Sequence, residues 1–461
     1  MKFTTTSYLA STQHSELEKN MIASKRRQAG ISFPAPRKQD YSLIVRLDII
    51  PTDDKKSVSQ GLKRLCTLFE KIDREIIEIE DTSNDEEMYM YPLTKFNFTA
   101  TVGFGKTFFK KLNLMKKCPK NLHDLPIHYE IGDQFPYTLL QTDMILQLAS
   151  SNHALNKMVL QNDQYLKPNE GLVTKDLQYL NDTENGLDIT DAIKGWAKIT
   201  DVHFGFHRAD GRNLMGFYDG ISNPHRLTNN NIWICGNEGE MEFEDGTFMV
   251  FQKIEHNLGE WGKLSTQEQE KWVGRSKATG LLLGTLSPDE ENKLVSELHS
   301  TDSSKQEQAK DRLSKLIDEQ RDPIKNFFDS YDIRYLNINK NCPESSHARR
   351  TNPRKKKSGM QGTIFRRGFL YMEDDFVEYP KTGILFISFQ NDIEIFIEMK
   401  RNMAQHVNTH TEMKEEGEKK NSYGNGISAK RSFDTLTLGG GYYYIPAIPG
   451  KRISEIGQHF F

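Results

Sequence analysis

Three short segments carry residues that could perform chemistry, and they follow one another along the chain. The first, Gly216-Phe-Tyr-Asp219-Gly-Ile-Ser-Asn-Pro224, holds an aspartate between glycines. Glycine lets the backbone turn sharply and approach a flat ligand closely. A carboxylate held in such a turn can accept a proton and return it. The ordinary alternative is a turn in which Asp219 only caps a helix or the local backbone.

The second segment is Ser346-His347-Ala-Arg349-Arg350-Thr-Asn-Pro-Arg354. A neutral imidazole is a good axial ligand for haem iron. The arginines that follow His347 could pair with the two haem propionates, because guanidinium binds a carboxylate bidentately. The alternative is a solvated basic loop, extended by the lysines at 355–357, that contacts phosphate groups.

The third segment is Thr363-Ile-Phe-Arg366-Arg367-Gly368. Apolar residues ahead of paired arginines predict a strand that ends at a pocket. Neighbours on a strand point to opposite faces, so only one of the two arginines can face a site there. A buried arginine near a strand end needs an anionic partner. A purely structural salt bridge is the alternative.

Taken together, the three segments resemble the dye-decolorizing peroxidases. GFYDG is similar to that family's GxxDG motif, HARRTNPR to its proximal-histidine segment, and IFRRG to its distal-arginine segment. The resemblance runs from about residue 41 to 450, and the order of the segments is preserved. It implies a haem peroxidase that reduces hydrogen peroxide and oxidises dyes, phenols or similar organic reductants. The supporting matches are residues 101–105, 141–146, 247–252, 269–277 and 435–446.

The resemblance also implies roles for residues of this chain. His347 is expected to bind the iron of one haem b per chain. Asp219 is expected to act first as general base and then as general acid, and Arg366 to stabilise the leaving oxygen. An adjacent cation lowers a carboxyl pKa, so activity is expected to favour acidic pH. Gly368 stands where some family members carry Asn, so no distal amide is expected there.

The expected haem-binding set extends beyond the iron ligand. A carboxylate that accepts the other ring N–H of His347 would favour the oxidised metal. Asp434 occupies a matching place, and Asp392 and Glu394 compete for that role. The full set consists of His347, Arg349, Arg354, Gly220, Ile221, Ser222, Asn223 and Asp434.

Two other functions remain open on the residues alone. One keeps the haem but uses it for iron or haem handling, or for peroxide sensing. The other takes the basic stretch at 349–357 as a nucleic-acid contact. The near-balanced charge, −3 over 461 residues, disfavours wholesale binding to nucleic acid or membrane.

The bulk features predict a cytoplasmic protein. Its four cysteines lack CxxC spacing, which fits a reducing compartment better than a disulfide framework or a zinc site. The N-terminus lacks the apolar core of a signal peptide, and no apolar run approaches the ~20 residues that span a bilayer. Whether the chain forms a homo-oligomer is left open.

The elements that must position these segments alternate between strands and helices, which predicts an α+β fold. Strands are expected at 42–50, 96–103, 143–148, 247–252 and 383–389, and helices at 58–72, 107–112, 154–160 and 392–403. The resemblance implies two ferredoxin-like halves of the dimeric α+β barrel type, each an antiparallel sheet flanked by helices, with haem in the second. The expected divisions are a tail or arm at 1–40, halves at 41–215 and 216–461, a charged helical insertion at 287–322 and a polar loop at 408–430.

Overall fold

The computed structural model describes most of the two sheets and the helices around them. The first half contains β1 (Tyr41–Ile49), α2 (Lys55–Glu80), β2 (Thr99–Phe104), α3 (Lys106–Lys111), β3 (Met144–Ser150), α6 (Ile189–Ile193) and β4 (Ala197–Phe206). β1 pairs antiparallel with β3 on one side and β4 on the other, and β2 pairs with β3. The described residues are 27–28, 30–31, 39–80, 98–125, 137–151, 188–221, 223, 232–235, 241–321, 338, 340–351, 364–373, 380–404, 435–448 and 452–461.

The second half repeats this arrangement with different sequence. Its strands are β5 (Thr247–His256), β6 (Phe365–Arg366), β7 (Phe369–Glu373), β8 (Lys381–Gln390) and β9 (Thr435–Ile445), and α13 (Ile393–Ala404) joins β8 to β9. β5 pairs antiparallel with β8 and β9, and β7 pairs with β8. The order of paired strands within each half is therefore the ferredoxin-like order, as expected.

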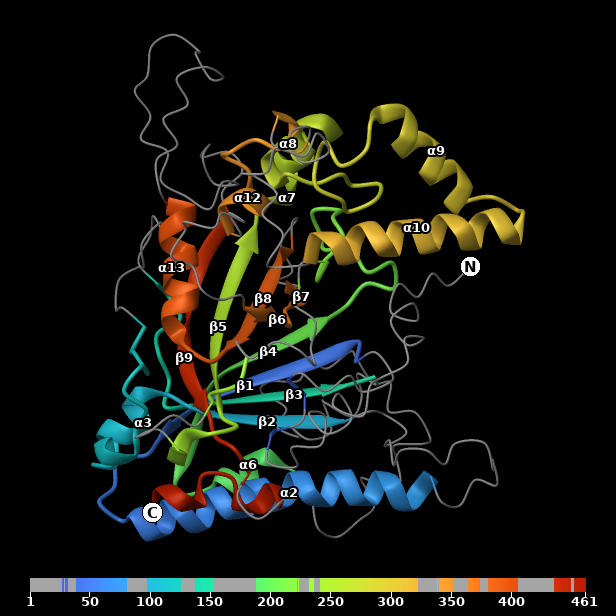
Figure 1. The fold of residues 1–461 in the computed structure, drawn as a ribbon. Coiled ribbons are helices and arrows are strands. Elements are labelled where there is room, and N and C mark those ends of the chain that lie inside the picture. The colour runs from blue at the N-terminus through green and yellow to red at the C-terminus, as the bar shows by residue number, and fades with distance from the viewer. Residues whose placement is uncertain are drawn as a thin grey trace, which may run out of the picture.

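The two halves close into one barrel. Phe206 of β4 pairs with Leu370 of β7, and Phe104 of β2 pairs with Tyr444 of β9. Together with the β5–β8 pairing, these contacts close the sheet formed by the described strands into a ring, in which β6 and β7 follow one another along the same side of β8. Figure 1 shows α2 and α6 beside the strands of the first half and α13 beside β5 and β9 of the second. The structure confirms the α+β fold of the barrel type.

The strands that were predicted from continuous apolar runs are buried on both faces. In β1, Leu43, Val45 and Leu47 pack with the apolar stripe of α2, which includes Val58 and Leu62. The alternate residue Ile44 belongs to a separate apolar cluster inside the barrel, with Phe251 and Tyr443. A strand that is buried on both faces needs apolar residues at successive positions, which explains its continuous apolar run.

A buried arginine lies inside the barrel as well. Arg46 is fully buried, and its Nη1 lies 3.1 Å from Oδ2 of Asp201 on the neighbouring β4. Its Nη2 donates to the carbonyl oxygen of Gly440 at 3.0 Å and to that of Leu140. Gly440 also lets β9 lie close to β5, because a Cβ there would lie 1.9 Å from the carbonyl oxygen of Phe251.

Two described residues of the expected N-terminal tail also pack against the barrel. The side chain of Gln28 donates to the carbonyl oxygens of Val102 (3.2 Å) and Pro446 (2.9 Å), and accepts from the N–H of Val102 at 2.8 Å. Ile31 is 1% exposed and belongs to the interior cluster. Part of this segment is thus held to the end of the barrel.

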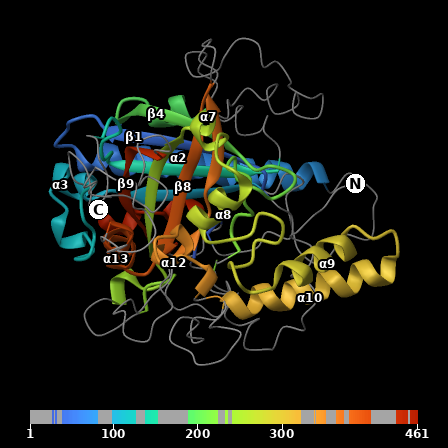
Figure 2. The ribbon, with the colours of Figure 1, turned by 90° about the horizontal axis from the view of Figure 1, so that it is seen from above.

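Outer helices extend from the second half. They are α7 (Leu258–Trp261), α8 (Thr266–Val273), α9 (Pro288–Leu298), α10 (Ser303–Arg321) and α12 (His347–Thr351). Capping boxes start α8 at Ser265 and α9 at Ser287, each closed by a glutamate three residues on. Figure 2 shows α9 and α10 side by side, projecting away from the strands.

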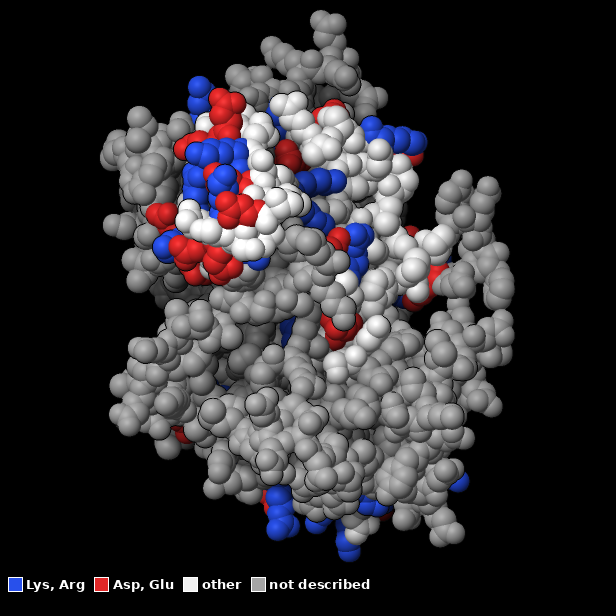
Figure 3. All heavy atoms as spheres, turned by 90° about the vertical axis from the view of Figure 1, so that its right-hand side faces the viewer, with Lys and Arg blue, Asp and Glu red and all other residues white. Residues whose placement is uncertain are grey.

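The α9–α10 pair occupies the charged stretch that was expected to form exposed helices. Figure 3 shows acidic and basic side chains interspersed on the face of the molecule that carries it. Lys293 and Glu297 of α9, and Asp311 and Lys315 of α10, form ion pairs one turn apart. Among the described helices, none is both long enough and apolar enough to cross a bilayer.

Candidate active site

The loop that carries Asp219 folds back on itself twice. Asn213 donates its N–H to the carbonyl oxygen of Phe217 at 2.8 Å, and Asp219 donates its N–H to that of Gly211 at 3.2 Å. Gly216 (φ 92°) and Gly220 (φ 73°) adopt left-handed conformations that favour glycine. These two residues explain why glycines flank the aspartate in the sequence.

The structure brings Arg366 to this loop. Its Nη1 lies 3.3 Å from Oδ1 of Asp219, and the two side chains are 31% and 34% exposed. The preceding residue, Phe365, is 2% exposed and packs inside the barrel. Alternation along β6 therefore turns Arg366 to the outer side of the barrel, toward the Asp219 loop.

Asn223 ties the loop to the backbone of Arg366. Its Oδ1 accepts the N–H of Arg366 at 3.0 Å, and its Nδ2 donates to the carbonyl oxygen of Arg366 at 2.7 Å. From the sequence, Asn223 was expected only as a member of the haem-binding set. The signal for this pairing is that a primary amide, which carries both donor and acceptor groups, can pair with both polar groups of a backbone residue.

A turn from Arg275 to Gly280 packs against the same loop, and only its residues up to 277 belong to a supporting match in the sequence. Ile221 is 8% exposed, and a Cβ at Gly280 would lie 2.1 Å from its Cδ1. Arg275 holds this turn by donating to the carbonyl oxygen of Gly280 at 2.7 Å. Within the loop, Arg212 stacks its guanidinium over the ring of Tyr218 at 3.8 Å and donates to the carbonyl oxygen of Gly216 at 2.8 Å. The loop is therefore supported by groups whose role was not anticipated.

His347 begins α12 and is half-buried. This short helix packs against α13 and α8. The residues after His347 turn inward: Ala348, Arg349 and Arg350 are all buried. Beside them lies a small apolar cluster that includes Leu282, Ile338 and Cys342. His347 is thus partly exposed to solvent, while the three residues after it are buried.

The two arginines after His347 contact the protein itself. Arg349 donates to the carbonyl oxygen of Cys342 at 2.9 Å and lies 3.1 Å from Oε1 of Glu344. Arg350 donates to the carbonyl oxygen of Met403 at 2.8 Å, and burial lowers its pKa. The first two arginines of the basic stretch are therefore buried and bonded to the protein itself.

Asp392 and Glu394, the other two candidates for accepting the ring N–H of His347, lie at the start of α13 and contact other residues there. Asp392 accepts from the N–H of Glu394 at 3.0 Å and from the side chain of Asn121 at 3.1 Å. Glu394 forms ion pairs with His123 (3.3 Å) and Arg401 (3.6 Å). Asp434, Arg354 and Ser222 lie outside the described residues.

The donor set fits a porphyrin. A haem brings its own nitrogen ligands, so the protein needs to add only one axial ligand and groups near the open face. The described residues contain no cluster of three or more histidine, cysteine or acidic side chains that could bind a metal by themselves. A single half-buried imidazole on one element and an Asp–Arg pair on others match what haem requires.

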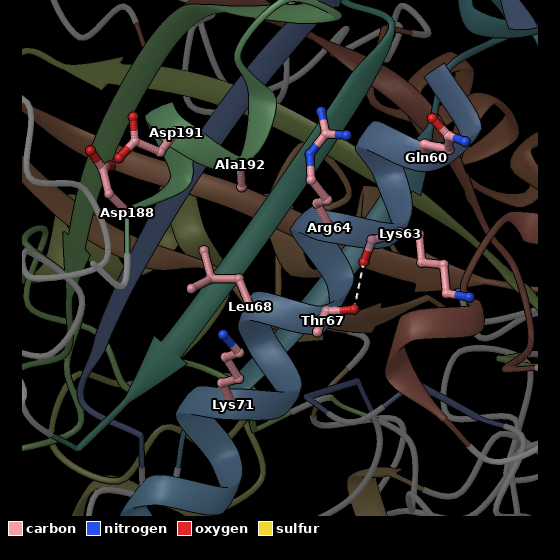
Figure 4. Close-up of a pocket in the computed structure, with 9 residues that line it drawn as sticks. All are labelled: Gln60, Lys63, Arg64, Thr67, Leu68, Lys71, Asp188, Asp191 and Ala192. Carbon is pink, nitrogen blue, oxygen red and sulfur yellow. Dashed lines mark hydrogen bonds between the residues drawn. The ribbon is translucent and has the colours of Figure 1, made fainter. Parts of the chain in front are cut away.

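A hollow lies in the first half of the molecule, between α2 and α6 (Figure 4). The α2 side is basic, with Lys63, Arg64 and Lys71, and the α6 side contributes Asp188 and Asp191. None of the expected site residues lines it. The dashed line in Figure 4 is a hydrogen bond within α2, so the view shows no pairing across the hollow.

Comparisons with known proteins point to one family. The model for "Dyp-type peroxidase, N-terminal" matches residues 28–165, and the model for "Dyp-type peroxidase, C-terminal" matches residues 210–418. A dye-decolorizing peroxidase of Thermobifida fusca is 23% identical over 82% of this chain and 75% of its own. One from Rhodococcus erythropolis is 34% identical, but the match covers only 20% of this chain and 27% of that protein.

Solved structures share the fold. A DyP-type peroxidase from Cellulomonas bogoriensis has a TM-score of 0.59 at 20% identity, covering 93% of this chain and 96% of its own. DtpA from Streptomyces lividans has a TM-score of 0.59 at 21% identity, covering 99% of this chain and 100% of its own. At this level of identity the likeness supports the same barrel, built from the same two halves.

Proposed function

Because the chain belongs to the Dyp-type peroxidase family, a family of haem-dependent oxidoreductases, we propose that it reduces hydrogen peroxide at one haem b per chain. It would take the electrons from an organic reductant such as a dye or a phenol. The observation that carries this proposal is the 3.3 Å contact between Arg366 and Asp219 on the outer side of the second half. A carboxylate and a guanidinium at this spacing provide both a proton carrier and a fixed positive charge.

Haem, when bound, supplies an iron centre that can exchange two electrons with peroxide. His347 would be its protein ligand, and Asp434 would accept the other ring N–H. Arg354 and Arg349 would pair with the propionates, for which Arg349 must exchange its contact with Glu344. Gly220, Ile221 and Ser222 would line the edge of the ring.

Asp219 would carry the proton. Among the described residues, both contacts of its carboxylate fall on Oδ1: the N–H of Gly220 at 2.7 Å and the guanidinium of Arg366. Oδ2 is therefore the oxygen that would take the proton from peroxide and return it to the oxygen that leaves. Such positioned acid–base catalysis contributes about 10²–10⁴-fold to a rate.

Arg366 would stabilise negative charge on the leaving oxygen. Its guanidinium has five N–H groups, so the contact with Asp219 leaves others for a ligand. A donor that is already in place spends no free energy on reorientation during the reaction. Because Gly368 offers no side-chain amide nearby, this stabilisation would depend on Arg366.

The cellular setting belongs to the same proposal. All four cysteines lie in the described part of the chain, and none forms a disulfide. This supports a reducing compartment such as the cytoplasm. We propose hydrogen peroxide and an organic reductant as the partners, with neither nucleic acid nor membrane required and homo-oligomers allowed.

The test uses two substitutions and two matched controls. His347→Ala should abolish or weaken haem retention, measured as the haem absorption band of the purified protein. Arg366→Leu should keep the haem and slow the reaction with peroxide by about 10²-fold or more. The exposed His299 and Arg401 provide the controls His299→Ala and Arg401→Leu, which should retain both properties. Unchanged haem binding and peroxide rates in the first pair would refute the assignment.

A further inference from the structure

β6 presents an open backbone edge at the position of Arg366. It continues the line of β7 along the same side of β8 and, among the described strands, pairs only with β8. Arg367 donates its N–H to the carbonyl oxygen of Ile387 on β8 at 2.8 Å. Backbone groups of successive strand residues point to opposite sides, so the N–H and carbonyl of Arg366 point away from β8.

The side chain of Asn223 occupies that open edge as a strand residue would. It accepts from the N–H of Arg366 at 3.0 Å and donates to its carbonyl at 2.7 Å. Only a primary amide of this length supplies one donor and one acceptor in a plane. The backbone of Asn223 continues the connection, because its N–H donates to the carbonyl oxygen of Gly220 at 3.0 Å.

The contacts close into a ring. Gly220 donates its N–H to Oδ1 of Asp219 at 2.7 Å, and that same oxygen faces Nη1 of Arg366 at 3.3 Å. The path thus runs from the Arg366 backbone through Asn223, Gly220 and Asp219, and returns to Arg366 through its guanidinium. Each part of the ring limits how far the carboxylate and the guanidinium can separate.

We infer that Asn223 is a positioning residue that sets the distance between Asp219 and Arg366 by pairing with the Arg366 backbone. This inference rests on the proposed function of the Asp219–Arg366 pair. This role is in addition to the expected place of Asn223 in the haem-binding set. Asn223 touches neither peroxide nor iron in this role, and acts only through the other two residues.

The decisive variant is Asn223→Asp, which keeps the size of the side chain. Its carboxylate can still accept the N–H of Arg366, but it places an oxygen against the Arg366 carbonyl. Asn223→Gln, which keeps both polar groups on a longer stem, is the second variant in case the first fails to fold. Asn213→Ala is the matched control, because its Oδ1 accepts the N–H of Phe217 at 3.0 Å in the same loop without reaching Arg366.

Four measurements separate positioning from a general structural role. In Asn223→Asp, the second-order rate with peroxide should fall about 10- to 100-fold, as expected for a misplacement of about 1 Å. The dependence on reductant at saturating peroxide and the haem absorption should stay unchanged. A crystal structure of the variant should show the Asp219 and Arg366 side chains separated beyond hydrogen-bond distance. Asn213→Ala should behave as the parent protein in all four.

The outcomes are distinct. A parent protein that binds haem but does not react with peroxide would refute the proposed function, while the crystal structure would still decide the role of Asn223. A variant whose Asp219–Arg366 contact and peroxide rate match those of the parent would overturn the inference. Equal losses in Asn223→Asp and Asn213→Ala would also overturn it, since they would indicate general damage to the loop.

Discussion

Arg366 and Asp219 meet on the outside of the barrel, with Nη1 and Oδ1 3.3 Å apart and each side chain about one-third exposed. Ion pairs with this much solvent contact contribute only about 0–1 kcal/mol to folding stability. The pair therefore does little to hold the fold together, which is consistent with the proposed role of its two groups toward a ligand.

Substitutions in this pair should separate activity from stability. Asp219→Asn removes the proton carrier, so the peroxide rate should fall about 10²–10⁴-fold. The midpoint of urea unfolding should correspond to a change of less than about 1 kcal/mol. The exposed pair Arg208–Asp210, 2.6 Å apart, provides the control Asp210→Asn, which should leave the rate unchanged. A variant of Asp219 with full activity would contradict the assignment of the proton carrier.

The ion pair inside the barrel should behave in the opposite way. Arg46→Met removes the donor that Arg46 offers to the carboxylate of Asp201 and to the carbonyl of Gly440. Burial alone would raise the pKa of Asp201, but His203 and Arg46 lower it overall, so the carboxylate stays charged. Loss of one partner of a buried pair costs about 3–5 kcal/mol, measurable by urea unfolding. Lys315→Met, at an exposed pair, should cost less than about 1 kcal/mol; equal losses in the two variants would contradict the prediction.

His256 should make the fold sensitive to acid. Its Nδ1 is buried without a hydrogen-bond partner in the described structure, and burial lowers the pKa of the ring to about 4. The unfolded chain takes up this proton near pH ~6.5. Between these two pKa values the unfolded state binds more protons than the folded state. The contribution of His256 to the free energy of unfolding is therefore complete above the unfolded pKa and decreases as the pH falls toward the folded pKa.

Replacing His256 with Phe should therefore flatten the dependence of unfolding free energy on pH. Between about pH 7 and pH 4.5, the free energy of unfolding should decrease less in the variant than in the parent, by on the order of 1–3 kcal/mol. Urea unfolding at several pH values measures it. His299→Phe is the control, because that ring is exposed and its Nδ1 lies 2.8 Å from the carbonyl of Val295. A parent and variant with parallel pH profiles would show that His256 does not contribute.

Replacing Gly61 with alanine should not bring the stabilisation that this substitution usually brings in a helix. Gly→Ala in a helix interior normally stabilises by about 0.5–1 kcal/mol. Here a Cβ would lie 2.2 Å from Cδ1 of Trp196, whose side chain is 1% exposed and hydrogen-bonded to Ala192. Overpacking a core costs about 1–3 kcal/mol, so Gly61→Ala should be less stable than the parent. The neighbouring exposed residue provides the control Gln60→Ala, and a thermal unfolding midpoint for Gly61→Ala at or above the parent's would disprove the clash.

Much of the fold could be predicted because it depends on local patterns. The strands expected at 42–50, 143–148, 247–252 and 383–389 appear as β1, β3, β5 and β8. Their apolar runs specify burial on both faces, which is a property of nearby residues. The helix after β1 was found from its apolar positions at steps of three and four. The helix expected at 154–160 lies outside the described residues.

The strand pairings that close the barrel could not be predicted from local patterns. It depends on backbone pairing between Phe206 and Leu370 and between Phe104 and Tyr444, residues that are far apart in the chain. The buried Arg46 in an otherwise apolar strand also gave no sign of its partners, which come from β4 and from segments ahead of β3 and within β9.

By itself, the sequence determined which residue types are available for the chemistry and in which order they occur. The glycines around Asp219, the lone His347 and the arginine at the end of a short strand are local features, because turn geometry and strand alternation depend on neighbouring residues. Only the tertiary structure decided which partner each group takes. It joined Arg366 to Asp219, engaged Asn223 with the Arg366 backbone and turned Arg349 toward Cys342 and Glu344. Hydrogen bonds and ion pairs require atoms within about 3–4 Å, and that proximity comes from how distant segments pack.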